Sequence, residues 1–439
     1  IVTFVNKYLT DQNYAVIYKK QGQNPNEKKM TKPTITPIVM NRDVASDFLK
    51  EIQNSNVKPI EPVFLDFKKD LSQLKAKSGI PVLYKQNTSN DLFQLIYVFD
   101  MGNNNDKALG TAFDYIDYLG TSDMTPEQVK SEFYRLACTF YVSPGNERTY
   151  VVLSGLNENM PDAMQLFEKL LADAQVDQEA YINMAGDILK ARADEKLNQG
   201  KSFSRLVSYA MYGPDSPTTN LLTEAELTKL NPQELVDRIH NQNSYKHRIL
   251  YYGPSSSKDL LAIINQHHQV PETLKDIPAG NEYPYLETPA TKVLIAPYDA
   301  KQIYMAQISN LDKKYDPAIE PVRELYNEYF GGGMNSIVFQ EMRETRGLAY
   351  SAWAGMMAPS YLKYPYVLRT QIATQNDKMI DAVNTFNDII NNMPESEAAF
   401  KLAKDGLMNR MRTDRIIKGD IIWSYIDAQD LGQNVDPRI

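Results

Sequence analysis

The chain has 439 residues, of which 43% are hydrophobic and 23% are charged, and these values are ordinary for a globular protein of two or three domains. The formal net charge of −8 argues against a nucleic-acid-binding surface, which is usually basic. No apolar run approaches the roughly 18 residues that a membrane span needs. We therefore expect no nucleic acid partner and no membrane span. Cys138 is the only cysteine, and we expect it to be a small buried side chain.

The start of the chain differs in pattern from the rest. Residues 1–20 have the pattern of a helix followed by a strand ending near Lys19, which predicts the tail of a preceding, truncated domain. Residues 21–75 are rich in Pro, Lys and Asn and predict a linker with one amphipathic helix near residues 44–52. We expect the chain to be part of a longer protein, with material missing at both termini. No export signal can be read at Ile1, so the location stays open, with the periplasm or cell envelope as a guess.

An internal repeat follows the linker. Pro81–Tyr84 corresponds to Lys292–Ile295 at an offset of 211 residues, from position 82 to position 293, and both segments predict strands. The alternating segments Leu92–Val98 and Ile303–Ile308 follow at the same offset, with the period of two that half-buried strands show. The repeat therefore predicts two domains of the same architecture.

Helices follow the strands in both copies, and each has apolar residues three to four positions apart. These are Met164, Phe167, Leu170, Leu171 and Ala174 in the first copy, and Ile380, Val383, Phe386 and Ile390 in the second. The order of elements predicts an α+β fold of two homologous domains, each a mainly antiparallel sheet with helices packed on one face. We place the first domain at residues 76–275 and the second, truncated at its C-terminus, at residues 276–439.

The segment from Phe330 to Tyr350 is the most informative one. Three glycines precede apolar residues at helical spacing, which predicts a helix that starts after the glycines. The apolar residues are Met334, Ile337, Val338 and Met342. We expect Gly347 to end this helix in a left-handed conformation, and Leu348–Ala352 to start the next strand. Arg343 and Tyr350 would then lie together at one helix-to-strand corner.

This segment resembles a signature of the insulinase (pitrilysin) family of zinc peptidases. The C-terminal half of that family has a glycine-rich turn, a helix, an arginine, and a tyrosine seven residues later. The resemblance implies that Arg343 and Tyr350 face across an enclosed chamber toward a zinc ion of the other half and hold the substrate near the scissile bond. Both side chains donate hydrogen bonds to the oxyanion that forms when water attacks a zinc-polarised carbonyl. A simpler interpretation is that Arg346 and Tyr350 only cap and pack the corner.

The resemblance also indicates where zinc ligands are missing. The family binds zinc with an inverted His-x-x-Glu-His motif on a helix, and alignment through Gly120 places this motif on Thr111–Tyr115. Thr111 and Tyr115 then occupy the histidine positions, and Asp114 occupies that of the glutamate. Two neutral hydroxyls do not make an ordinary tetrahedral zinc site. We expect no metal or other cofactor on this chain and no catalytic residue that acts alone, with zinc in a missing N-terminal half.

The histidines show no metal-site spacing and no nearby paired carboxylate, so we expect solvated or locally bonded side chains at His240, His247, His267 and His268. Two functional hypotheses remain. In the first, the chain is the substrate-binding half of a two-half zinc endopeptidase. Its partners are a peptide substrate and a zinc-bearing N-terminal half, in the same polypeptide or in a partner subunit. In the second, it is a non-catalytic peptide-binding or scaffold subunit of the same family.

Overall fold

The computed structural model of the chain describes residues 1–10, 12, 14–22 and 44–439, and it divides into two units, residues 1–37 and 38–439. The first unit contains helix α1 (Val2–Tyr8), as expected, but the described residues 14–20 form no strand. The predicted strand is wrong because a single strand has no sheet to join within this unit. Residues 11 and 13 of the predicted tail, and residues 23–43 of the predicted linker, lie outside the described residues.

The second unit begins with the short helices α2 (Asp47–Gln53) and α3 (Phe67–Asp70). The side chain of Ser46 caps α2 by accepting a hydrogen bond from the backbone N–H of Leu49 at 3.2 Å. The amphipathic helix predicted near residues 44–52 is therefore present. Its apolar residue Phe48 is 72% exposed.

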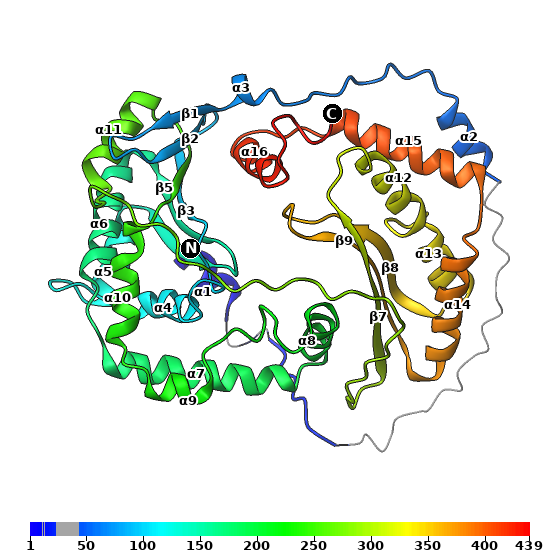
Figure 1. Cartoon of the computed structure of the whole chain (residues 1–439), viewed down its shortest axis with the longest axis horizontal. Helices are drawn as coiled ribbons and strands as arrows, with labels where there is room; N and C mark the ends of the chain where they lie inside the picture. Colours follow the sequence, from blue (N-terminus) through cyan, green and yellow to red (C-terminus); the bar gives the residue numbers. More distant parts are fainter. Residues whose placement is uncertain (11, 13, 23–43) are drawn as a thin grey trace. The chain divides into compact units, whose positions relative to one another are not determined.

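Six strands form the first sheet, in the order β1-β2-β6-β3-β5-β4 (Figure 1). Their bounds are Ser72–Lys75 for β1, Pro81–Gln86 for β2, Leu92–Phe99 for β3, Cys138–Pro144 for β4, Thr149–Leu156 for β5 and Arg248–Gly253 for β6. Neighbouring strands are antiparallel except for β2 and β6. Cys138 is 2% exposed, which confirms that it is a buried side chain.

Helices of the first copy pack mainly against one face of this sheet. Their bounds are Leu109–Tyr115 for α4, Pro126–Arg135 for α5, Met160–Asp173 for α6, Gln178–Lys196 for α7, Gln199–Tyr212 for α8, Glu224–Lys229 for α9, Gln233–Asn241 for α10 and Ser257–His267 for α11. The stripe predicted on α6 is confirmed, because all five of its residues are exposed by 2% or less. It packs with Leu95, Tyr97 and Phe99 of β3 in the largest apolar cluster.

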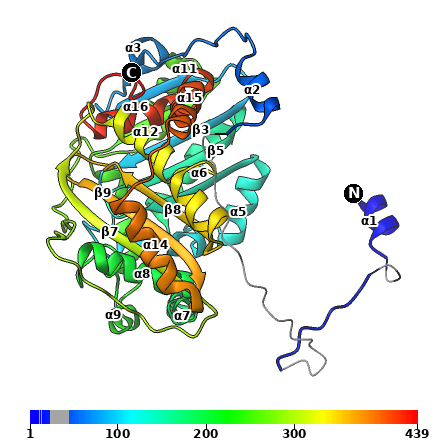
Figure 2. The ribbon, with the colours of Figure 1, turned by 90° about the vertical axis from the view of Figure 1, so that its right-hand side faces the viewer.

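The second sheet has three antiparallel strands in the order β7-β9-β8. Their bounds are Gln302–Lys314 for β7, Ala349–Met357 for β8 and Pro365–Gln375 for β9. The helices are α12 (Glu320–Phe330), α13 (Ile337–Phe339), α14 (Met379–Asn391), α15 (Glu397–Thr413) and α16 (Asp420–Asp430). Figures 1 and 2 show α12, α13 and α14 on the same side of the three strands.

The predicted stripe of α14 is correct only in part. Ile380, in the first turn of the helix, is 69% exposed, whereas Ala382, Phe386 and Ile389 are buried. The apolar stripe therefore begins one residue before Val383. The spacing of apolar residues along the sequence did not show that the first turn of α14 extends past the edge of the core.

The internal repeat is confirmed by the order of elements. After β3, and again after β7, the chain forms two helices, two strands and three helices. The fold is therefore of the mixed α+β class, with mainly antiparallel sheets. The strand predicted at Lys292–Ile295 is wrong, since residues 288–300 are irregular and Ile295 is 80% exposed. Its counterpart β2 is bonded on both sides, by β1 and β6, and 292–295 has no such neighbours in the described chain. The domain boundaries themselves stay a prediction.

Each sheet also receives a helix from the other copy. Ile421, Ile422 and Ile426 of α16 pack against the first sheet, on the face opposite to α6. Phe203 of α8 contacts Tyr304 of β7 edge-on, with ring centroids 5.6 Å apart. The two copies are therefore packed through reciprocal helices. Among the described residues, no helix has both the length and the apolar character required to cross a membrane.

Candidate functional site

A glycine turn at the end of α12 positions the segment that carries Arg343 and Tyr350. A Cβ atom on Gly331 would lie 2.0 Å from the carbonyl oxygen of Ala354 in β8, and one on Gly332 would lie 2.9 Å from that of Asn327. Glycine is needed here because the end of the helix touches the strand backbone directly. Gly120, its counterpart in the first copy, makes a similar approach, at 2.2 Å from the carbonyl oxygen of Met124.

The predicted helix begins later than expected. Ser336 caps it, with its hydroxyl accepting from the N–H of Phe339 at 3.3 Å, and α13 starts at Ile337. Ile337, Val338 and Met342 are fully buried, as predicted. Met334 is 73% exposed, so its predicted burial is wrong, because it lies in the turn before the cap.

A π-helix, Gln340–Thr345, continues directly from α13. π-Helical turns are rare in proteins, and those that occur are often found at functional sites. The turn ends where the N–H of Gly347 bonds the carbonyl of Arg343 at 3.0 Å, and Gly347 has a φ of +54°. The left-handed glycine predicted from the sequence is therefore confirmed.

Arg343 and Tyr350 meet at this corner. The guanidinium carbon of Arg343 lies 4.8 Å from the ring centroid of Tyr350 and 4.9 Å from that of Phe339. The pairing register of β8 shifts between Ala349 and Ser351, which places Tyr350 in a bulge, and its side chain is 80% exposed. In the part of the chain that is described, the Tyr350 hydroxyl has no hydrogen-bond partner. The predicted proximity is confirmed, and the role of the two residues toward a substrate stays a prediction.

Arg346 is oriented differently. Its Nε lies 3.5 Å from a carboxylate oxygen of Glu341. This ion pair joins the residue that follows the π-helical turn to the second residue of the turn. Among the described residues, Arg343 is paired with the carboxylate of its neighbour Glu344 at 3.4 Å.

Helix α4 carries the positions that correspond to the zinc motif. The apolar residues that we expected to be buried, Leu109, Ala112, Phe113 and Ile116, are exposed by 3% or less. Asp114 lies on the exposed side of the helix, Thr111 is half-buried and Tyr115 is fully buried. Burial raises the pKa of Asp114, and the charge of Asp117 raises it further.

Tyr115 is committed to the core. Its hydroxyl donates a hydrogen bond to the carbonyl of Asp177 and accepts one from the N–H of the same residue at 2.9 Å. Its ring meets that of Tyr181 edge-on, with centroids 5.8 Å apart. Asp177 is also the N-cap of α7, so Tyr115 helps to fix the start of that helix. The Tyr115 hydroxyl thus donates one hydrogen bond and accepts another, both with the backbone of Asp177.

The residues of α4 do not fit a zinc ion. The three motif positions offer no imidazole, and the Tyr115 hydroxyl has two other partners. Across residues 1–10, 12, 14–22 and 44–439, no group of three or more His, Cys, Asp or Glu side chains lies in an arrangement that could hold a metal ion. We therefore derive no chemical step through zinc on this chain.

Two histidines form a buried network that the sequence did not reveal. His268 Nδ1 lies 2.6 Å from Oε1 of Glu168, and His268 Nε2 lies 2.8 Å from Nε2 of His247. His247 Nδ1 lies 2.7 Å from the carbonyl oxygen of Tyr245. Glu168 also accepts from the Tyr97 hydroxyl at 2.8 Å. Our expectation of solvated histidines without a carboxylate partner is wrong for this pair, because Glu168 is a hundred residues away in sequence.

Nδ1 of His247 faces the carbonyl oxygen of Tyr245, so this nitrogen carries a hydrogen and Nε2 is left to meet His268. Burial, and next the neighbouring His268, lower the pKa of His247 to about 4.

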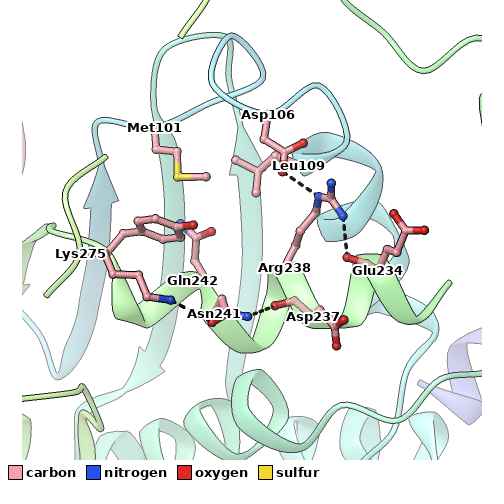
Figure 3. A pocket seen from close by; sticks show the side chains of 10 residues that line it. Met101, Asp106, Leu109, Glu234, Asp237, Arg238, Asn241, Gln242 and Lys275 are labelled. Carbon is pink, nitrogen blue, oxygen red and sulfur yellow. Dashed lines mark hydrogen bonds and ion pairs between the residues drawn. The ribbon is translucent and has the colours of Figure 1, made fainter. Parts of the chain in front are cut away.

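A surface cavity of about 300 Å³ lies between α10 and the loop before α4 (Figure 3). It is lined by Met101, Asp106, Leu109, Glu234, Asp237, Arg238, Asn241, Gln242, Tyr245 and Lys275. Arg238 is paired with Asp106 at 2.7 Å. The cavity belongs to the first copy and none of its lining residues comes from the Arg343 corner.

Comparisons with known proteins agree with this arrangement. Residues 248–407 match the family model described as the peptidase M16 inactive domain. An uncharacterized zinc protease from Rickettsia felis is 22% identical over 303 residues, which make up 65% of this chain and 69% of that protein. The crystal structure of a peptidase M16 inactive domain from Pseudomonas fluorescens matches with a TM-score of 0.60 at 17% identity, and covers 83% of this chain and 86% of that chain.

The structure of the periplasmic protease PqqL from Escherichia coli matches with a TM-score of 0.68 at 12% identity. The match covers 98% of this chain and 46% of that one. At these identities the structural matches establish the fold. The chain therefore has the fold of these peptidase structures, and its residues 248–407 match the M16 inactive-domain family.

Proposed function

We propose that this chain is the substrate-binding half of a two-half zinc endopeptidase, with zinc supplied by an N-terminal half. The observation that carries the proposal is the contact between Arg343 and the exposed Tyr350 at the π-helical corner. A phenol that is 80% exposed gains little from a purely structural role. The Tyr350 hydroxyl lies beside the guanidinium of Arg343, and this position suits it to contact a bound substrate.

The geometry of the corner favours hydrogen-bond donation to a developing negative charge. Arg343 lies over two aromatic rings, which restrict its guanidinium without using its N–H groups. The Tyr350 hydroxyl has no partner among the described residues, so its proton is available to a substrate. Donors that are placed in advance stabilise an oxyanion more than the neutral carbonyl from which it forms.

The edge of β8 is closed to strand addition at Met356, six residues along the strand from Tyr350. The side chain of Asn327 bonds the N–H of Met356 at 2.8 Å and its carbonyl at 3.0 Å. A peptide can therefore not extend the sheet at that point. We propose instead that the substrate lies across the sheet face that is not covered by α12–α14.

The test is Tyr350→Phe in the assembled peptidase, with the zinc-bearing half present. Removal of one oxyanion donor is expected to lower kcat by roughly 100-fold, with KM nearly unchanged. The free energy of unfolding should change by less than about 0.5 kcal/mol, because the hydroxyl is exposed. Tyr134→Phe is the matched control, since Tyr134 is 88% exposed on α5. Equal kcat values for the two variants would refute the proposed role.

The second candidate is a non-catalytic peptide-binding or scaffold subunit of the same family. It is favoured by Tyr115, whose hydroxyl is used to hold the start of α7 rather than a metal ion. In that case the chain would bind peptides, and Tyr350→Phe would leave turnover by any associated zinc-bearing half unchanged. The same kinetic experiment therefore separates the two candidates.

A further inference from the structure

The face of the second sheet that points away from α12–α14 carries an arginine, Arg369, without a carboxylate partner among the described residues. Strand pairing places Arg369 of β9 between Ile308 of β7 and Gly355 of β8. The neighbouring residues Ala354 and Ile372 belong to the apolar cluster formed with the helices of this copy. Because side chains alternate along a strand, Arg369 projects from the opposite face. Figure 1 shows that α12, α13 and α14 all lie on the other side.

Arg369 lies on an aromatic side chain. Its guanidinium carbon is 5.5 Å from the ring centroid of Trp353, and its Nη2 donates to Oε1 of Gln371 at 2.9 Å. Its Nε is buried and has no hydrogen-bond partner within the described part of the chain. Burial lowers the pKa of Arg369, and no carboxylate of the described residues opposes this effect.

Three other partly buried arginines of the described chain are paired with carboxylates. Arg148, Arg238 and Arg323 each have a carboxylate oxygen at 2.5, 2.7 and 2.7 Å. The chain has 55 acidic residues and 47 basic ones, so acidic partners are not scarce. A buried N–H donor without a partner is costly, and an anion that binds the guanidinium would satisfy it. No carboxylate of the described chain is paired with Arg369, so such an anion would come from outside these residues.

We propose that Arg369 and Trp353 form a binding site for a carboxylate of the peptide substrate. This inference rests on the proposed function, and adds a preference for substrates with an acidic group. The guanidinium presents an edge that can hold a carboxylate through two parallel hydrogen bonds. The ring of Trp353 holds the guanidinium in place.

The strand geometry fixes where that acidic group belongs. Arg369 is paired with Gly355, five positions along β8 from Tyr350. At about 3.3 Å per residue, this separation is roughly 16 Å along the strands. An extended peptide whose scissile bond lies at Tyr350 would therefore place a side chain about five residues away at Arg369. The carboxylate is either an Asp or Glu side chain or the C-terminus of the peptide.

The experiment measures peptide binding to this chain by fluorescence anisotropy, without the zinc-bearing half. The probes are labelled, amidated peptides in which one Glu is moved stepwise along an otherwise neutral sequence, with Gln peptides as controls. We expect the best Glu peptide to bind about tenfold more tightly than its Gln counterpart, and the advantage to alternate with a period of two. A second series compares free and amidated C-termini, which distinguishes the two sources of the carboxylate.

The variant Arg369→Gln should abolish the preference for Glu, and Arg410→Gln should retain it. Arg410 is a suitable control because its charge lies in the helical layer, paired with Glu328 at 2.7 Å. Circular dichroism checks that each variant is folded, and Arg369→Lys, which keeps the charge but loses the planar fork, should restore only part of the preference. Quenching of Trp353 in a Trp423→Phe background locates the bound peptide.

A Glu preference that survives in Arg369→Gln would overturn the proposal, as would equal binding of all Glu and Gln peptides by the unmodified chain. These outcomes are independent of the kinetic test of Tyr350. If Tyr350→Phe has no effect on kcat while the Glu preference depends on Arg369, the proposed catalytic contribution fails and the carboxylate site stands.

Discussion

Acidification is predicted to destabilise the fold through His247. This side chain is 8% exposed and is neutral in the network with His268 and Glu168. Its pKa is about 4 in the folded chain, below the ordinary value of 6.5, because burial disfavours the charged ring. The unfolded chain therefore binds one more proton than the folded chain between these two values. The contribution of His247 to the free energy of unfolding should be constant above pH 6.5, fall as the pH decreases toward 4, and change no further below that.

The size of the effect follows from the shift. A difference of 2.5 between 6.5 and about 4, at 1.36 kcal/mol per pKa unit, gives on the order of 3 kcal/mol lost across this interval. Such a loss is a large fraction of the stability of a typical protein. It should be insensitive to salt, since the groups involved are shielded from solvent.

Urea unfolding at a series of pH values from 7 to 4 measures this loss. The informative variant is His247→Gln, which cannot titrate and whose amide oxygen can still accept from His268. His267→Gln is the control, because His267 is next to His268 in sequence but, among the contacts of the described chain, has none with Glu168. The unmodified chain and the control should lose about 3 kcal/mol more than His247→Gln between pH 7 and 4. Parallel losses in all three proteins would show that His247 is not the titrating group.

Three further variants test the packing arguments. Gly331→Ala should destabilise the chain by roughly 1–3 kcal/mol or more in urea unfolding, because its Cβ would overlap the strand backbone, whereas Gly333→Ala, which meets no backbone atom, should be nearly neutral. Tyr115→Phe should cost about 1–3 kcal/mol by the same measurement, because two hydrogen bonds to the backbone of Asp177 are lost, and an unchanged midpoint would contradict the structural role assigned to the hydroxyl. Arg148→Ala should cost about 3–5 kcal/mol by leaving the carboxylate of Asp430 buried and unpaired, and Asp430→Asn added to it should recover part of the loss.

Local patterns predicted the repeated units well. The strands β3 and β7, the stripe of α6 and the left-handed Gly347 all depend on residues close in sequence, which the periodicity records. The corner of Arg343 and Tyr350 was predicted for the same reason, because a helix, a glycine and a strand follow one another directly.

The failures have a common cause in contacts between distant segments. Lys292–Ile295 has the composition of a strand, and whether it forms one depends on neighbours that composition does not show. The pairing of His268 with Glu168 joins residues of α6 and the end of α11. The same is true of Arg369, whose position over Trp353 follows from the register of β8 and β9. A missing carboxylate becomes visible only when all neighbours of a side chain are known.

The repeat itself indicates which copy carries the functional corner. At the offset of 211 residues, Arg343 corresponds to Glu132 and Tyr350 corresponds to Thr139. Glu132 is paired with Arg135 at 2.6 Å within α5, and Thr139 bonds Ser154 across the sheet at 3.3 Å. Both counterparts therefore have side-chain partners within the first copy. The Tyr350 hydroxyl, in contrast, has no hydrogen-bond partner in the described chain. The same scaffold thus forms a closed corner in the first copy and an open one in the second, which supports our proposal that the second copy contacts the substrate.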